Sequence, residues 1–330
     1  MTSIFHLGLL PNRPVAACVD LARAAEELGF EGIWIADSQC VFRDAHSVLS
    51  VCAVRTQKLL LAAGVTNPIT RHPAVLAGSW ATLQEMSGGR AILGIGVGES
   101  AIETLGLKPA RLADLERVID LVRRLMRGEA VQHDGHEVRL PWANFHVPVV
   151  IAASGPKSLQ LAGRIADGVL FQVGAELTFM RYALDNIRIG AEQAGRKLED
   201  VRLYARLACV VHEDRALARE QIKGYAAVAA GTVFRNMPRE YFPDALWDEL
   251  QRMKAQYNYL EHGSDAAGHR ALMTDRILDA VSVSGSPDEA IPRLNALRAL
   301  GVDAFVCPMS MADPLPFMRT FAAAVMPHVR

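Results

Sequence analysis

The chain has 330 residues, of which 51% are hydrophobic and 22% are charged, and its formal net charge is −1. This composition is typical of a globular enzyme with a large core, and the near-neutral charge argues against a general binder of nucleic acid. No apolar run reaches the roughly 20 residues that a membrane span needs, the N-terminal stretch lacks a secretory signal, and the five scattered cysteines are typical of reduced thiols. We therefore expect a cytoplasmic protein without a membrane or nucleic-acid partner.

Short apolar runs alternate along the chain with longer helical patterns. The runs are continuous rather than alternating, which is typical of strands covered on both faces in a parallel sheet. Strands are expected at 4–10, 32–36, 59–63, 91–96, 147–153, 168–173, 201–211 and 303–307. Helices are expected at 14–29, 44–57, 73–86, 111–128, 158–166 and 288–301.

Eight strands that alternate with helices predict a (β/α)8 barrel, and a doubly wound open sheet is the alternative. Residues 232–278 interrupt the repeat with a helical pattern rich in aromatic and charged side chains. We expect one domain over 1–330, with an inserted helical cap at about 230–280 above the barrel. Residues 131–140 alternate around an Asp-Gly pair, which predicts a hairpin outside the main repeat.

Glycine and polar residues gather directly after the predicted strands, where parallel α/β folds bind ligands. Ser154-Gly155-Pro156-Lys157 follows one strand and opens a helix, so its free N–H groups could bind an anion. Gly174, after the next strand, could complete a phosphate site from the neighbouring loop. An ordinary tight turn, which also needs glycine, explains the same pattern.

Two carboxylates fall at the predicted mouth of the barrel. Glu99 follows Gly96-Val97-Gly98, and partial burial there would suit a proton donor or acceptor. The alternative is a solvated glutamate that the dipole of the following helix stabilises. Asp37, with Ser38, ends the second strand.

The histidines and glycine motifs point to no metal or dinucleotide site. His6, inside a strand, is expected to be a core residue, and His72 to order the start of a helix. His133 and His136 have metal-like spacing without further ligands, so we expect no bound metal. The spacing Gly94-x-Gly96-x-Gly98 differs from GxGxxG and gives no support for a Rossmann site.

Three stretches together carry a family resemblance: GVTNPITRHPAV from residue 64, LQEMSGGRAILGIGVGES from residue 83, and IAASGPKSLQLAGRIADGVL from residue 151. The chain resembles the luciferase-like flavin-dependent oxidoreductases, and within them most the branch of methylenetetrahydromethanopterin reductase and its bacterial relatives. The resemblance implies a (β/α)8 barrel with an insertion that binds FMN or the deazaflavin F420 at the carboxyl ends of its strands.

The resemblance also implies site residues. It places a non-prolyl cis peptide at Gly64–Val65 behind the cofactor ring, Thr66 and Asn67 at the ring edge, and Ser154, Gly155 and Pro156 at the phosphate. The residues expected to bind the cofactor are Gly64, Val65, Thr66, Asn67, Gly98, Ala153, Ser154, Gly155, Pro156 and Gly174. Glu99 matches a proton donor of some deazaflavin enzymes, and Asp37 would contact the ring or the substrate, so both are expected to be catalytic.

One residue departs from the family pattern. Several relatives have a histidine directly after the aspartate that ends the second strand, and this chain has Ser38 there. Serine without a partner is no base near neutral pH, so histidine-based chemistry, including light emission, is not expected.

Three functions remain open from the sequence. The first is hydride transfer between F420 or FMN and a small organic substrate. The second is oxygenation by a monooxygenase that receives reduced FMN from a separate flavin reductase. The third is a flavin-binding barrel without turnover, since a fold does not guarantee an activity. We also expect a homodimer, as in many relatives.

Overall fold

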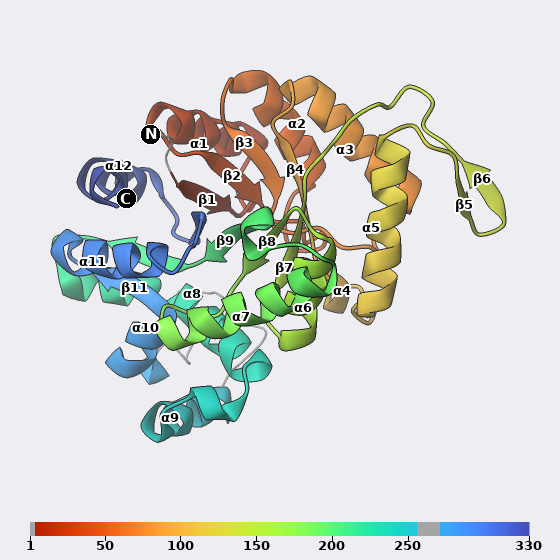
Figure 1. Ribbon diagram of the computed structural model, residues 1–330. Coiled ribbons are helices and arrows are strands. Elements are labelled where there is room, and N and C mark those ends of the chain that lie inside the picture. The colour runs from red at the N-terminus through yellow and green to blue at the C-terminus, as the bar shows by residue number, and fades with distance from the viewer. Residues whose placement is uncertain (1–3, 256–270, 330) are drawn as a thin grey trace.

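The computed structural model describes residues 4–255 and 271–329, and its centre is a closed barrel of eight parallel strands (Figure 1). The strands follow one another around the barrel in the order β1, β2, β3, β4, β7, β8, β9, β12. Their bounds are Phe5–Leu9, Gly32–Ile35, Leu60–Ala63, Ala91–Ile95, Val149–Ala153, Gly168–Phe171, Arg202–Arg206 and Ala304–Met309. Because β1 pairs with both β2 and β12, the sheet closes, and the predicted barrel is confirmed against the open sheet.

Helices surround the barrel and bury their apolar faces against it (Figure 1). They are α1 (Val15–Glu27), α2 (Ala45–Arg55), α3 (Pro73–Ser87), α4 (Ser100–Glu103), α5 (Leu112–Met126), α6 (Pro156–Ile165), α7 (Leu177–Gln193), α11 (Pro287–Arg298) and α12 (Leu315–Ala324). Local sequence sets their ends. In α3, for example, Pro73 occupies the first turn after His72, whose ring accepts a hydrogen bond from Ala74 N, and Gly88 ends the helix with a φ of 63°.

The expected strand at 201–211 is wrong in its length. The chain leaves the barrel after β9, and β10 (Ala208–Val211) pairs with β11 (Ser282–Gly285) in a separate parallel sheet. Residues on both sides of the break are buried, so the apolar run continues through it and gives no local signal. The helices α7 and α12 and the strand β11 were also not expected from the sequence.

The segment between the seventh and eighth barrel strands is largely helical. It contains α8 (Arg215–Asn236), α9 (Asp244–Ala255) and α10 (Asp275–Val281), so it begins earlier than the expected residue 232. Part of the expected cap, residues 256–270, lies outside the described residues. Across the two described ranges, no helix has both the length and the apolar character that crossing a membrane requires.

The predicted hairpin is confirmed. Strands β5 (Val131–His133) and β6 (His136–Val138) pair in antiparallel fashion and project from the body of the protein beside α5 (Figure 1). Asp134 and Gly135 form the turn with φ angles of 50° and 80°, the left-handed conformation that an Asp-Gly pair tolerates.

Side chains fill the middle and the amino-terminal end of the barrel. The middle holds a cluster of inward-facing residues: Trp34, Ala62, Ile92, Val150, Leu170, Tyr204, Ala304 and Val306. His6 is fully buried below it, against the ring of Tyr204, and its Nε2 lies 3.0 Å from Glu31 Oε2. Arg202 donates a hydrogen bond of 2.7 Å to the other oxygen of Glu31. Described side chains therefore fill the barrel interior at its amino-terminal end, whereas a hollow remains at the carboxyl end.

Candidate functional site

A hollow lies at the carboxyl end of the barrel interior. Its lining consists of Gly8, Leu9, Leu10, Trp34, Ala36, Gly64, Leu170, Arg206, Val306 and Pro308. Side chains alternate along a strand, so the residue two positions after each member of the central cluster also faces inward. Those positions include Gly64, Gly94 and Ala152, and the two glycines leave room for Trp34: a Cβ on Gly64 would lie 2.9 Å from Trp34 Cβ, and one on Gly94 would lie 3.0 Å from Trp34 Cζ3. Small residues at the ends of the strands therefore allow the Trp34 side chain to line the hollow.

The loop after β3 forms one wall of this region. The peptide bond between Gly64 and Val65 is cis, as the family resemblance implied. Thr66 follows, fully buried, with its backbone bonded to Gly94 and Gly96 and its hydroxyl without a partner among the described residues. Asn67 Oδ1 accepts hydrogen bonds of 2.9 Å from the N–H groups of Ile69 and Thr70, whereas its buried Nδ2 has no partner in the same described ranges. Two buried polar groups are thus left for a ligand or water to satisfy.

The loop after β4 brings Gly98 and Glu99 to the same end. Gly98 has a φ of 89°, and a Cβ there would lie 2.3 Å from Ile102 Cγ1 and 3.4 Å from Asn67 Cβ. The chain therefore needs glycine at this position, next to the loop after β3. Glu99 lies at the surface, with its side chain 60% exposed, and its Oε1 accepts a hydrogen bond of 3.0 Å from Arg235 at the end of α8.

The loop after β7 opens α6 as the sequence predicted. Ala153 ends the strand, Gly155 precedes the helix, and Pro156 occupies its first turn. Within the described part of the chain, no side chain caps the first N–H groups of α6, so an anion could accept hydrogen bonds from them. The end of α8 lies above this turn, since a Cβ on Gly155 would be 3.8 Å from Asn236 Oδ1.

Gly174 has a packing role of its own. Its φ is 87°, and a Cβ there would lie 2.7 Å from the carbonyl oxygen of Ala280. The next residue, Ala175, donates a hydrogen bond to that same oxygen. Close contact with the end of α10 therefore requires glycine here, and a cofactor contact of Gly174 stays a prediction.

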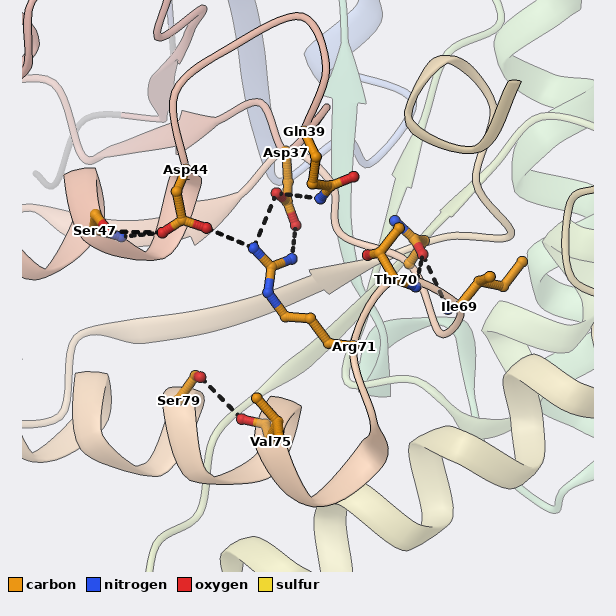
Figure 2. Close-up of polar contacts among 10 residues, drawn as sticks. Asp37, Gln39, Asp44, Ser47, Ile69, Thr70, Arg71, Val75 and Ser79 are labelled. Carbon is orange, nitrogen blue, oxygen red and sulfur yellow. Dashed lines mark hydrogen bonds and ion pairs between the residues drawn. The ribbon is translucent and has the colours of Figure 1, made fainter. Parts of the chain in front are cut away.

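Asp37 is the centre of a buried polar network (Figure 2). Its side chain is 1% exposed, and Arg71 donates a hydrogen bond of 2.7 Å to Oδ2 while Gln39 donates one of 2.7 Å to Oδ1. The other guanidinium nitrogen of Arg71 reaches Asp44 Oδ2, also at 2.7 Å. Asp44 in turn accepts from Ser47 N and so caps α2. Arg71 thus joins the end of β2 to the start of α2.

Sequence reasoning missed several polar residues of this region. His46 packs its ring against Trp80, and burial, followed by the charge of Arg71, lowers the pKa of its imidazole. Neither ring nitrogen has a hydrogen-bond partner among the described residues. A neutral histidine therefore lies near Asp37, although Ser38 replaces the histidine that some relatives have. Arg71 and Arg206 were also missed; the inward alternation from Tyr204 could have indicated Arg206, whereas no local signal pairs Arg71 with Asp37.

The remaining histidines fit no metal centre. His72 and His133 approach ring to ring with centroids 4.9 Å apart, whereas His136 is exposed at the turn of the hairpin. Among the residues that the structure describes, no group of three or more histidine, cysteine or acidic side chains could hold a metal ion.

Comparison with known proteins identifies the family. The sequence profile described as luciferase-like monooxygenase matches residues 2–304. The chain belongs to this family. A 5,10-methylenetetrahydromethanopterin reductase from Methanolobus tindarius is 33% identical over 310 residues, which cover 92% of this chain and 93% of the relative. An F420-dependent glucose-6-phosphate dehydrogenase from Nakamurella multipartita is 30% identical over 94% of this chain and 91% of its own length.

The luciferase-like family likeness extends to three dimensions. The structure of coenzyme F420-dependent tetrahydromethanopterin reductase from Methanopyrus kandleri superposes with a TM-score of 0.83 at 25% identity, and the match covers 100% of both chains. The chain is accordingly an enzyme of the oxidoreductase class. The hypothesis of a flavin-binding barrel without catalytic activity is therefore set aside.

Proposed function

We propose that this enzyme transfers a hydride between the deazaflavin F420 and a small organic substrate. The supporting observation is the similarity over nearly the full chain to a dehydrogenase and a reductase whose names state F420 dependence, at 30% and 25% identity. FMN is the alternative cofactor, since the family profile carries a monooxygenase description.

The residues around the hollow fit such a cofactor. The hollow is lined largely by apolar residues, among them Trp34, Ala36 and Leu170, and the apolar body of a cofactor ring would lie against them. The unpartnered Thr66 hydroxyl and Asn67 amide are placed to bond a ring edge, and the uncapped N–H groups of α6 at Ser154–Pro156 suit a phosphate. Val65, Gly98 and Ala153 would contact the cofactor through their backbone. The bound cofactor supplies the carbon or nitrogen that gives or accepts the hydride.

We assign proton transfer to Glu99 and a supporting contact to Asp37. The Glu99 side chain is 60% exposed, and Arg235 donates a hydrogen bond to its Oε1, so we assign the proton exchange to its Oε2. Asp37 already accepts from Arg71 and Gln39, so its contact with ring or substrate would use its remaining acceptor positions. The helices α8 to α10 would form the cap above both residues.

Equilibrium binding of purified protein to F420 and FMN, each oxidised and reduced, tests the cofactor. We expect tighter binding of F420 than of FMN, followed by a bleach of F420 absorbance with a matching substrate. Preference for reduced FMN, with oxygen uptake, would instead establish the oxygenating reaction and a need for a flavin reductase. Binding of neither cofactor would refute the proposal.

Glu99→Gln tests the proton transfer in the same enzyme. Loss of a general acid or base lowers turnover by about 10²- to 10⁴-fold. Cofactor affinity should stay unchanged. Glu103→Gln, one turn further on α4 and also exposed, is the matched control and should retain full turnover. Equal turnover in Glu99→Gln and wild type would remove Glu99 from the mechanism.

The homodimer and the cytoplasmic location stay predictions. Neither follows from the contacts of a single chain. The mass of the purified protein by light scattering would measure the first, with twice the 35.9 kDa of one chain as the expected result.

A further inference from the structure

Two arginines on β9 point into the barrel at opposite ends. Arg202, Tyr204 and Arg206 alternate along the strand, and Tyr204 belongs to the interior cluster, so all three face inward. Arg202, at the amino end, pairs with Glu31 at 2.7 Å. Arg206, at the carboxyl end, lines the hollow and has no acidic partner within the described parts of the chain. The charge of Arg202 is thus balanced by Glu31, whereas the charge of Arg206 is not balanced by a described carboxylate.

The neighbours of Arg206 are polar. Its guanidinium carbon lies 5.8 Å from the centre of the Tyr225 ring. Burial raises the pKa of Tyr225, whereas the charge of Arg206 and side-chain hydrogen bonds with Arg206 and Gln172 act in the opposite direction. Arg206 therefore lines the hollow, and Tyr225 and Gln172 form one polar cluster with it. We call these three residues the arginine side of the hollow.

The opposite side of the hollow has a different character. In the closed strand order, β9 and β8 lie across the barrel from β3 and β2. The arginine side therefore faces Gly64 on the β3 side and Trp34 and Ala36 on the β2 side. A ligand at this end of the barrel therefore meets apolar side chains on one side and the positive charge of Arg206 on the other.

We propose, on the basis of the proposed function, that Arg206 faces the pyrimidine edge of the bound cofactor ring and stabilises negative charge on its N1 and C2 carbonyl. A charge near N1 is one of the means by which a protein tunes such a ring. Arg206 is half-buried, and a guanidinium at such a position acts more strongly than it would in bulk solvent.

The chemical consequence concerns a proton. The reduced ring can release the proton on N1 to solvent, and it keeps the hydride that it received. Arg206 favours the form without that proton, because opposite charges attract. The protein thereby lowers the pH at which the bound, reduced ring ionises, and it stabilises the reduced cofactor relative to the oxidised one.

Anaerobic pH titration of the bound reduced cofactor, followed by absorbance, tests this inference without turnover. An opposite charge close to a titrating group shifts its midpoint by about 1 to 3 pH units. In Arg206→Gln we expect the midpoint to rise by that amount and the affinity for reduced cofactor to fall by about 10-fold or more. Arg206→Lys, which keeps the charge, should recover most of the shift. Arg188→Gln, which removes a charge on the exposed face of α7, is the control and should titrate like wild type.

The outcomes separate this inference from the proposed function. If wild type binds F420 or FMN and Arg206→Gln shows the wild-type midpoint and affinity, the role of Arg206 is refuted and the cofactor assignment stands. If wild type binds neither cofactor, the proposed function fails and the role of Arg206 fails with it. Circular dichroism of each variant establishes that a lost affinity does not arise from unfolding.

Discussion

Arg71 makes two ion pairs of equal length that should differ greatly in their contribution to stability. Its guanidinium lies 2.7 Å from Asp37 and 2.7 Å from Asp44. The Asp37 side chain is 1% exposed, whereas that of Asp44 is 47% exposed. Removing one member of a buried pair costs about 3–5 kcal/mol, because the remaining charge stays buried without a partner. A half-exposed pair contributes only about 0–1 kcal/mol.

The comparison uses Arg71→Met and Asp44→Asn. Arg71→Met leaves Gln39 as the one side-chain donor to the Asp37 carboxylate that the described residues provide, so we expect the free energy of unfolding to fall by about 3–5 kcal/mol. Asp44→Asn removes the charge but keeps an oxygen to cap α2, so its cost should remain within about 1 kcal/mol. The double variant Arg71→Met with Asp37→Asn removes both buried charges and should regain a large part of the loss.

Urea denaturation at pH 7, followed by both fluorescence and circular dichroism, measures these differences. Two probes are needed because a chain of this size can unfold through intermediates. Equal costs for Arg71→Met and Asp44→Asn would show that burial does not set the strength of the pair. A double variant no more stable than Arg71→Met would show that the cost arises from lost packing of the arginine stem.

Two further predictions concern the core. Burial lowers the pKa of His6 below its ordinary 6.5 against the effect of Glu31, so the unfolded chain binds more protons. The contribution of His6 to the free energy of unfolding should be fully present above pH 6.5. Below that pH the free energy of unfolding, measured by urea denaturation at a series of pH values down to 5, should fall by up to about 1.4 kcal/mol per pH unit. The same dependence on pH in His6→Asn would contradict this. A Cβ on Gly190 would lie 1.9 Å from the Gln160 carbonyl oxygen, so Gly190→Ala should cost about 1–3 kcal/mol. Gly231→Ala, in open space on α8, should instead stabilise by up to about 1 kcal/mol, and similar melting temperatures for the two variants would refute the packing account.

The sequence alone determined the repeat and the position of the site within it. Continuous apolar runs, glycine stops such as Gly88 and the Asp134-Gly135 turn act through nearby backbone, so their signals are local. The loops after β3, β4 and β7 could be expected at one end because parallel strands place their carboxyl ends together. The family resemblance added the cis peptide at Gly64–Val65, which no composition or periodicity indicates.

Only the tertiary structure decided which side chains meet at that end. Arg71 and Asp37 are 34 residues apart in the chain, and Arg235 and Glu99 are 136 apart. The break between β9 and β10 likewise depends on β11, a strand more than 70 residues later. Barrel closure and register set these contacts, and they also place Arg206 across the hollow from Gly64. Local sequence determines where each helix or strand lies and to which side each of its residues points. Contacts between residues that are far apart in the chain form only when the sheet closes into a barrel.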